Sequence, residues 1–304
     1  MREKTAEQLE KKAKLCEEII DRYLPAPKGY YAVLTDAMRY SVNAGGKRIR
    51  PVIMMETCKI FGGAPSGVLE PFVAAIEMIH TYSLIHDDLP AMDNDDYRRG
   101  RKTTHKVYGE AIAILAGDGL LNLAYEVASS AFDAGTYTDR VIKALKILAK
   151  KPGFSGMIGG QTIDIEAEKD HIEISEDSLK TMYDLKTAAL MECAMMIGAT
   201  LAGASDKVVS EIEKIAGLFG LAFQIQDDIL DIKGDAAKLG KPVGSDEKNN
   251  KPTYAAILGT DIAAEKVAEL SNAAIDKLKI FMAANPEYDG FLADLFEYMI
   301  NREK

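Results

Sequence analysis

Helix-forming residues run through almost the whole chain, and the strict alternation of apolar and polar residues that is typical of strands is nearly absent. Ala, Leu, Met, Glu and Lys dominate the long segments, and these residues favour helices. Thr5 and Gln8 form a capping box for a first helix that should end at about Arg22. Further helices are predicted at Tyr30–Asn43, Arg50–Phe61, Val68–Leu89, Val107–Phe132, Thr138–Ala149, Gly156–Glu166, Ser175–Ala202, Lys207–Asp231, Ile262–Ala284 and Tyr288–Asn301. We therefore expect an all-α protein built as a helical bundle.

Breakers separate the predicted helices but do not divide the chain into halves. Gly45-Gly46, Gly62-Gly63 and Pro152-Gly153 fall between helices. The polar run from Lys233 to Pro252 is the longest loop candidate, and long loops in compact domains often bind ligands. The chain has no compositional linker and no repeat of fixed period, so residues 1–304 are predicted to form a single domain.

The charge balance excludes one class of function. The 304 residues include 37 basic and 47 acidic side chains, which gives a net charge of −10. An acidic chain of this kind disfavours a nucleic-acid binder, because such proteins need a basic face. Anionic small molecules are not excluded, since a local cluster of cations can lie inside an acidic protein.

The cysteines and the apolar segments point to a cytoplasmic protein without a membrane span. Cys16, Cys58 and Cys193 are far apart, no CxxC pair exists, and such thiols are typical of a reducing compartment. The segment MREKTAEQLEKKAKL is too charged for a signal peptide. The longest apolar stretch, Ala188–Ala204, contains Glu192 and falls short of the ~20 residues that cross a bilayer, so we expect a buried helix.

Two clusters of aspartates each follow a strongly apolar helix. The first is DDLPAMDNDD at 87–96, and the second is DDILD at 227–231. Aspartates are almost never buried without a partner. One such cluster could be a solvated helix end, but two clusters in the same context favour a functional site.

The spacing within the clusters indicates which side chains converge. His80 and Asp87 are seven residues apart and share one helical stripe. Pro90 should end the helix near Leu89, so that the chain folds back and Asp93 lies beside Asp87.

In the second cluster Asp227 and Asp231 share a helix face, and Gln224 precedes them on the same stripe. Clustered carboxylates repel one another unless cations lie between them. Oxygen ligands suit Mg²⁺, which usually bridges carboxylates to substrate phosphates. Neither cluster has the spacing of an EF-hand, which argues against a dedicated Ca²⁺ loop.

Basic residues are interleaved with the acidic clusters. GGKRIRP at 45–51 places three cations at a predicted helix start, where anions are favoured. It is not a P-loop, because Ser41 stands where that motif needs glycine. Arg98-Arg99 follow the first cluster, Lys186-Thr187 lie in an apolar helix, and Lys241 lies in the long loop. Isolated surface cations are usually only solvated, but together with magnesium-type carboxylates they indicate a site for polyphosphorylated substrates.

These motifs resemble those of the trans-isoprenyl diphosphate synthases, specifically the bacterial-type short-chain members. The resemblance follows the chain order through GGKRIRP (45–51), HTYSLIHDDLPAMDNDDYRRGRKTTH (80–105), GEAIAILAGDGLL (109–121), GMIGGQTIDI (156–165), LKTAAL (185–190), FGLAFQIQDDILDIKGD (219–235), LGKPVGSDE (239–247) and KPTY (251–254). The first aspartate motif has the two-residue insertion found in bacterial farnesyl and many geranylgeranyl diphosphate synthases. The resemblance implies an all-α fold around a deep central cavity, and usually a homodimer.

The resemblance also assigns roles by motif position. It implies three Mg²⁺ ions, with Mn²⁺ as an alternative, on Asp87, Asp93 and Asp227, and supporting contacts from Asp88 and Asp231. Isopentenyl diphosphate would be bound by Lys47, Arg50, His80 and Arg99, and the allylic diphosphate by Arg98, Lys186 and Lys241. Thr187 and Gln224 would line the carbocation, and Arg48 is interpreted as structural.

The implied reaction is ionisation, condensation and elimination, with dimethylallyl and then geranyl diphosphate extended to (E,E)-farnesyl diphosphate. Geranylgeranyl diphosphate is the alternative product. A class I terpene cyclase would typically carry a different second metal motif, and a non-catalytic helical subunit would be expected to have lost one aspartate motif. Intact DDILD and GGKRIRP argue against both.

Product length is expected to depend on the helix before Asp87. Ser83, four residues before Asp87, is best aligned with it but is small. Tyr82, five residues before, is bulky, yet helical geometry alone does not choose it. The resemblance does, because bacterial-type farnesyl synthases tend to carry an aromatic residue there. The alternative is that Tyr82 is ordinary core.

Overall fold

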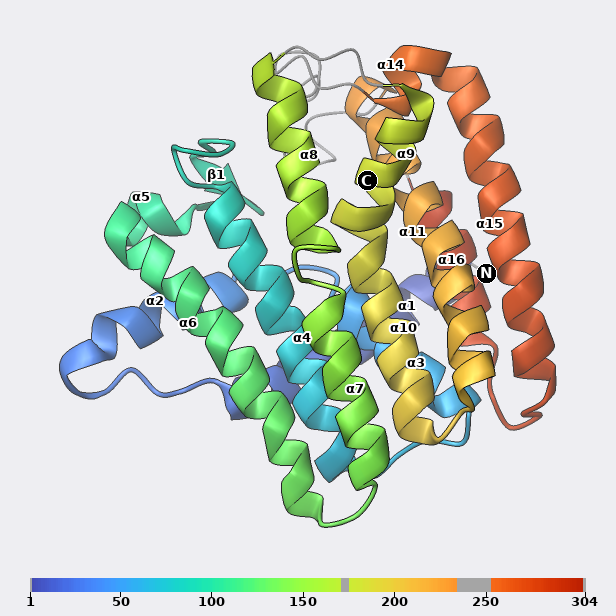
Figure 1. Cartoon of the computed structure of the whole chain (residues 1–304), viewed down its shortest axis with the longest axis horizontal. Helices are drawn as coiled ribbons and strands as arrows, with labels where there is room; N and C mark the ends of the chain where they lie inside the picture. The colour runs from blue at the N-terminus through green and yellow to red at the C-terminus, as the bar shows by residue number, and fades with distance from the viewer. Residues whose placement is uncertain (1, 171–174, 234–252, 303–304) are drawn as a thin grey trace.

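The computed structural model describes residues 2–170, 175–233 and 253–302, and this part of the chain is almost entirely helical (Figure 1). The prediction of an all-α fold is confirmed. The α-helices are α1 (Arg2–Tyr23), α2 (Ala32–Val42), α3 (Ile49–Ile60), α4 (Ser66–Asp87), α5 (Thr104–Tyr108), α6 (Glu110–Ser129), α7 (Thr138–Lys150), α8 (Met157–Asp170), α9 (Glu176–Tyr183), α10 (Ala189–Ala202), α11 (Asp206–Lys233), α14 (Tyr254–Leu258), α15 (Thr260–Ala283) and α16 (Phe291–Ile300). Short 3₁₀-helices cover Gly29–Tyr31 and Ser130–Ala134, and a π-helical turn covers Asp184–Ala188.

The structure corrects three details of the predicted elements. The helix predicted at Val107–Phe132 is broken at Gly109, whose φ of 84° is incompatible with helix, so α5 and α6 are separate. The helix predicted at Ser175–Ala202 contains the π-helical turn. A hairpin of β1 (Tyr97–Arg98) and β2 (Arg101–Lys102) follows the first aspartate cluster. Residues 234–252, most of the predicted long loop, lie outside the described residues.

The core forms where α4 packs on α6 and where α10 packs on α3 and α11. α4 and α10 lie among the other helices in Figure 1. Most buried apolar side chains belong to one large cluster, and a smaller cluster lies between α9, α11, α14 and α15. Leu218 and Ile300 pack against both clusters. The two clusters therefore adjoin each other, and a single domain at 1–304 stays a prediction.

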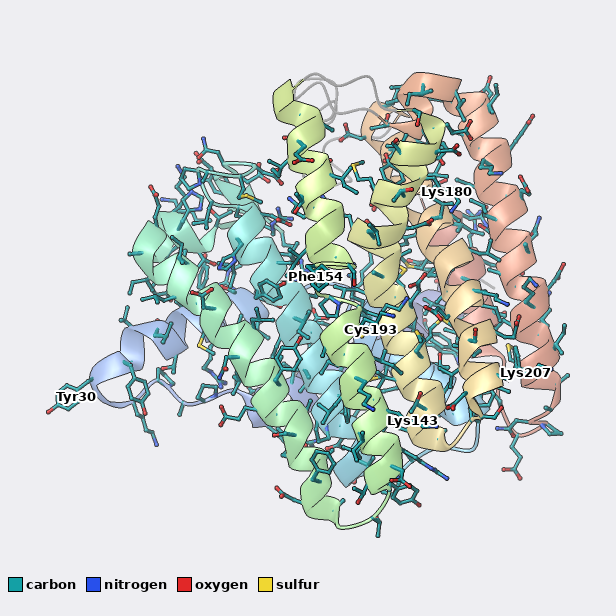
Figure 2. The ribbon with its side chains drawn as sticks, viewed as in Figure 1. Tyr30, Lys143, Phe154, Lys180, Cys193 and Lys207 are labelled. Atoms are coloured by element: carbon teal, nitrogen blue, oxygen red, sulfur yellow. The ribbon has the colours of Figure 1, made fainter. Side chains whose placement is uncertain are left out.

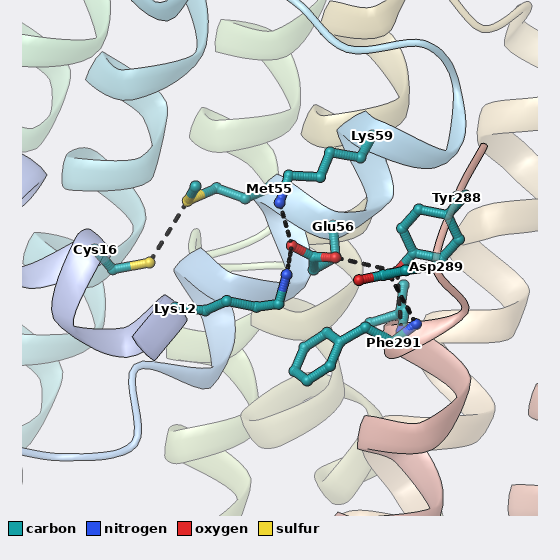
Figure 3. Close-up of polar contacts among 9 residues, drawn as sticks. Lys12, Cys16, Met55, Glu56, Lys59, Tyr288, Asp289 and Phe291 are labelled. Atoms are coloured by element: carbon teal, nitrogen blue, oxygen red, sulfur yellow. Dashed lines mark hydrogen bonds and ion pairs between the residues drawn. The ribbon is translucent and has the colours of Figure 1, made fainter. Parts of the chain in front are cut away.

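A buried carboxylate ties the N-terminal helix to the C-terminal segment (Figure 3). Glu56 on α3 is 1% exposed and accepts hydrogen bonds from Lys12 at 2.8 Å and Lys59 at 2.7 Å. The hydroxyl of Tyr288, just before α16, donates to its other oxygen at 3.2 Å. Burial raises the pKa of Tyr288 far above its ordinary value, so the phenol stays a donor. The network fixes the position of α16.

Three described helical segments are long and apolar enough, by length and composition, to cross a membrane. They are Ser66–Asp87, Glu110–Ala134 and Glu176–Ala202, with 72%, 39% and 72% of their apolar windows buried inside the protein. The stretch Ala188–Ala204 was expected to fall short of a span, but most of it belongs to the last of these segments, because the helix that ends at Ala202 continues back through the π turn to Glu176. The interpretation of α10 as a buried helix is confirmed.

Candidate active site

A cavity of about 640 Å³ opens between α4, α6, α8 and the π-helical turn. Much of its wall is apolar, with Leu121, Met157, Ile158, Ile165 and Leu190 among the lining residues. The predicted site residues that line it are Arg50, His80, Tyr82, Ser83, Asp87, Lys186 and Thr187. The cavity therefore brings together predicted site residues from three of the motifs, at 45–51, 80–105 and 185–190.

The first aspartate cluster lies where α4 ends, next to the β1–β2 hairpin (Figure 1). The chain folds back as predicted, because the amide of Asp93 donates to the carbonyl oxygen of Asp87 at 2.9 Å. Burial raises the pKa of Asp87 to about 6, with Lys186 opposing the shift and Asp93 adding to it. Burial also raises the pKa of Asp88 to about 6, against the effect of Arg98. Desolvation dominates both shifts, so a cation bound beside these carboxylates would stabilise their charged forms.

The second aspartate cluster lies on α11, and its members do different things. Asp227 is 39% exposed and forms an ion pair with Arg302, which follows α16. Asp231 is buried. Asp228 is 2% exposed and accepts hydrogen bonds from the hydroxyl of Tyr183 at 2.7 Å and the side-chain amide of Gln224 at 3.2 Å.

Asp228 thereby orients Gln224 for its contact with the π-helical turn. The Oε1 of Gln224 accepts a hydrogen bond from the hydroxyl of Thr187 at 2.8 Å. The two residues predicted to line the carbocation are therefore in contact. Asp228 itself was not predicted as a site residue, because its cluster was interpreted only as a source of metal ligands.

The described residues contain no group of three or more His, Cys, Asp or Glu side chains close enough to hold a metal ion by themselves. Mg²⁺ does not need such a cage, because it is usually held by one or two carboxylates together with waters and substrate phosphates. The hard oxygen donors and the raised pKa values of Asp87 and Asp88 fit such an ion.

The basic motif at 45–51 begins α3 and presents its cations in different directions. Arg48 is 3% exposed and donates to Glu77 at 2.7 Å and to the carbonyl oxygen of Val42 at 2.7 Å, which agrees with its interpretation as structural. Arg50 lies beside His80, with 3.2 Å between Nη1 and Nε2. Lys47 is exposed.

The Arg50–His80 contact fixes the protonation of the imidazole. Burial, and then the charge of Arg50, hold the pKa of His80 well below its ordinary value. Since guanidinium only donates, Nε2 of His80 accepts and the ring proton lies on Nδ1. Burial lowers the pKa of Arg50 to about 10, and the carboxylates of Glu77 and Asp227 oppose that shift. His80 is therefore a neutral group in a positive pocket.

The adjacent arginines of the hairpin point to different parts of the site. Arg98 donates to Asp88 at 2.6 Å and so lies with the first aspartate cluster. Arg99 donates to the carbonyl oxygen of Gly45. A Cβ at Gly46, where φ is 126°, would lie 2.6 Å from the guanidinium carbon of Arg99, so only glycine lets this side chain approach. Arg99 is thus held against the basic motif.

Two residues that form ion pairs with predicted site residues were not predicted from the sequence, and one predicted site residue lies outside the described part of the chain. Lys186 forms an ion pair with Asp164, whose side chain is 5% exposed. Asp164 lies in the motif GMIGGQTIDI (156–165), three residues after Gln161. This spacing puts both polar side chains on one helix face, and it is the sequence feature that could have indicated Asp164 as a site residue. No local pattern points to Arg302 as the partner of Asp227. Lys241 lies outside the described residues.

Comparison with known proteins agrees with this geometry. The family model described as polyprenyl synthetase matches residues 31–279. A farnesyl diphosphate synthase of Geobacillus stearothermophilus is 47% identical over 83% of this chain and 84% of that protein. A chloroplastic geranylgeranyl pyrophosphate synthase of Catharanthus roseus is 42% identical over 88% of this chain and 73% of that protein. The crystal structure of an FPP/GFPP synthase from Zymomonas mobilis has a TM-score of 0.85 at 33% identity, covering 99% of this chain and 100% of that one.

A helical fold around a largely apolar cavity whose wall also carries carboxylates and cations is typical of the isoprenoid synthase class. The match to the family model and the extent of the identity place the protein within it: the chain belongs to the polyprenyl synthetase family. The resemblance drawn from the motifs is confirmed.

Proposed function

We propose that the protein is a short-chain trans-prenyltransferase that condenses isopentenyl diphosphate with dimethylallyl and then geranyl diphosphate to give (E,E)-farnesyl diphosphate. The observation that carries the proposal is the cavity itself. Its wall carries Arg50, Lys186 and Asp87 together with apolar side chains from α6, α8 and α10.

The proposed metal is Mg²⁺, about three ions per site, with Mn²⁺ as an alternative. Asp87, Asp93 and Asp227 would hold the ions, with Asp88 and Asp231 in support. When bound, the ions neutralise the allylic diphosphate and make it a leaving group. The pKa values of Asp87 and Asp88, raised to about 6, support this assignment, because burial disfavours their charged forms even with Arg98 beside Asp88, and a bound cation would favour those forms.

The residues of the chain bind the two diphosphates and shield the carbocation from water. In this proposal Arg98, Lys186 and Lys241 bind the allylic diphosphate, and isopentenyl diphosphate is bound by Lys47, Arg50, His80 and Arg99. The hydroxyl of Thr187 and the amide of Gln224 present dipoles to the carbocation formed when the carbon–oxygen bond breaks. The alkene of isopentenyl diphosphate attacks that carbon. The apolar wall excludes water, and the departing proton passes to the released diphosphate, since no side chain is an evident base.

Tyr82 is proposed to set the product length. Its side chain lines the cavity, is 5% exposed and lies one turn before Asp87 on α4. The geranylgeranyl alternative is kept because a relative carrying that name is 42% identical. Ser83 also lines the cavity and is the smaller neighbour.

The test is the product chain length from purified protein, the two five-carbon diphosphates and Mg²⁺, read by chromatography. Farnesyl diphosphate as main product supports the proposal. Mainly geranylgeranyl diphosphate would favour the alternative. Cyclic hydrocarbon from an allylic diphosphate alone would identify a terpene cyclase, and no turnover would indicate a non-catalytic subunit.

A homodimer and a cytoplasmic location are also proposed. Figure 2 shows Tyr30 pointing away from the body of the molecule, and it is 108% exposed. On α6, Ile114 and Leu115 are 44% and 51% exposed, which leaves an apolar face for a second copy. Light scattering should give the mass of two chains, and Leu115→Glu should give a monomer. The three cysteines are free, which agrees with a reducing compartment.

A further inference from the structure

His86, directly before the first aspartate motif, is wedged between α4 and α6. The imidazole occupies the space in which a Cβ at Gly117 would lie, so the ring contacts the backbone of α6. Its Nε2 lies 3.1 Å from the carbonyl oxygen of Ile114. A carbonyl oxygen only accepts, so Nε2 carries the proton and donates to it. Asp118, at 3.9 Å from the same nitrogen, is beyond hydrogen-bond distance.

The other side of this ring contacts Tyr82. The two residues are four apart on α4 and therefore share a face of the helix. Their ring centroids are 5.8 Å apart, and the planes meet at 78°, an edge-to-face arrangement. Both side chains line the cavity.

The orientation of Tyr82 has no polar anchor of its own. In the described part of the chain its buried hydroxyl has no hydrogen-bond partner. The direction of the ring is therefore set by packing, and His86 is a neighbour whose own position is fixed by a hydrogen bond to another helix.

We propose that His86 is a positioning residue for product length. Held on α6 at Gly117, it keeps the ring of Tyr82 across the cavity and so makes Tyr82 an effective stop. The inference rests on the proposed role of Tyr82. It gives a function to His86 and to Gly117, which lies in the motif GEAIAILAGDGLL (109–121). Neither metal binding nor diphosphate binding requires these two residues.

A different arrangement would place His86 itself against the growing chain, with no need for Tyr82. The two arrangements differ in additivity. If His86 acts through Tyr82, removing both side chains should have the effect of removing Tyr82 alone. If each blocks the chain separately, the effects should multiply.

The experiment compares the ratio of C20 to C15 products, separated by chromatography after dephosphorylation, for Tyr82→Ala, His86→Ala and the double variant. We expect His86→Ala to raise the ratio about two- to tenfold, the factor that corresponds to losing an aromatic pair of ordinary strength. The double variant should match Tyr82→Ala to within about twofold. Circular dichroism and thermal unfolding check that each variant folds.

His86→Gln distinguishes the contribution of the ring from that of the hydrogen bond to Ile114. It also replaces His86→Ala in the experiment if the alanine variant does not fold. It keeps an N–H donor for the carbonyl of Ile114 and loses the ring, so it should lengthen products as His86→Ala does. Restoration of the normal ratio by glutamine would overturn the inference, because the hydrogen bond alone would then explain the effect.

Gly117→Ala removes the seat of the imidazole without changing His86, and it should alter the ratio. Gly67→Ala is its matched control, since a Cβ at Gly67, also on a helix, meets nothing within 4 Å and should leave the ratio unchanged. A ratio that Gly117→Ala leaves at the normal value contradicts the proposed seat.

The two proposals fail separately. If Tyr82→Ala lengthens products and His86→Ala does not, or if their effects multiply, the role of His86 is wrong and the Tyr82 stop remains. If Tyr82→Ala leaves product length unchanged, the stop is wrong and the inference about His86 falls with it.

Discussion

Glu77 is a buried carboxylate that forms an ion pair with Arg48 of the basic motif at 45–51. Loss of its charge should destabilise the protein strongly. Its carboxylate and the guanidinium of Arg48 are each 2% exposed, at 2.7 Å from each other. Removing one partner from a buried pair costs about 3–5 kcal/mol, because the other charge remains buried without compensation. Glu77→Gln keeps the shape and loses the charge. Arg48 would retain Glu17, which lies 3.3 Å away and is 46% exposed.

We therefore expect the lower end of that range, about 3 kcal/mol, which corresponds to a fall in Tm of roughly 5 °C for a chain of 304 residues. Urea unfolding followed by circular dichroism measures the free energy, and a thermal scan measures Tm. Glu17→Gln is the matched control, because it removes the exposed partner of the same arginine and should cost about 0–1 kcal/mol. Equal losses in the two variants, or a loss below about 1 kcal/mol in Glu77→Gln, would refute the reasoning.

Three further predictions concern the site. Asp87→Ala and Asp227→Ala should each lower kcat about 10²–10³-fold, the effect of losing one preorganised electrostatic contact, and near-normal turnover in either would contradict the three-metal assignment. Arg99→Lys should mainly raise the KM for isopentenyl diphosphate and Arg98→Lys mainly that for the allylic partner, because the two forks are held by different segments. Equal changes in both constants would contradict this division. His80 has a pKa well below 6.5 in the folded protein, so the unfolded chain binds an additional proton as pH falls through about 6.5 and stability is lost by up to ~1.4 kcal/mol per pH unit. His80→Gln should remove that part of the pH dependence, and an unchanged slope of Tm between pH 7.5 and pH 5 in the variant would show that another group causes it.

The long helices could be predicted from composition and period, whereas the interruptions could not. Gly109 was visible, but a single glycine inside an apolar run is often tolerated, and only the structure shows that its φ of 84° ends one helix before another begins. The β1–β2 hairpin has two residues per strand, too few for a period of two to be detected. The π-helical turn at Asp184–Ala188 differs from an α-helix by one inserted residue and has no compositional sign.

The candidate site was predictable to the extent that charge in an apolar context is informative. Asp87 stood out because it ends an apolar helix, and Lys186 because it interrupts one. The partner of each charge was not predictable. Lys186 pairs with a residue 22 positions away, and Arg302 pairs with one 75 positions away. Such pairs depend on how helices cross, which the order of motifs does not specify.

The cations near the aspartate motifs are already paired with carboxylates of the chain. Ion pairs join Arg98 to Asp88, Lys186 to Asp164 and Arg302 to Asp227. A half-buried charge without a partner would be costly, so these pairs keep the site stable before any ligand arrives.

Binding of a diphosphate and a divalent ion would then replace these ion pairs by ion pairs with the ligands, and would not introduce uncompensated charge. In the proposed function a diphosphate would offer oxygens to Arg98 and Lys186, and a divalent ion would offer positive charge to Asp227 and to the carboxylates that the cations release. Each buried group would exchange one opposite charge for another, so neither ligand alone completes the exchange. We infer that metal and diphosphate bind in a mutually dependent way. The affinity of the protein for inorganic diphosphate, measured by calorimetry and corrected for the Mg²⁺ that free diphosphate itself binds, should rise when Mg²⁺ is present, and an affinity that does not change would contradict the exchange.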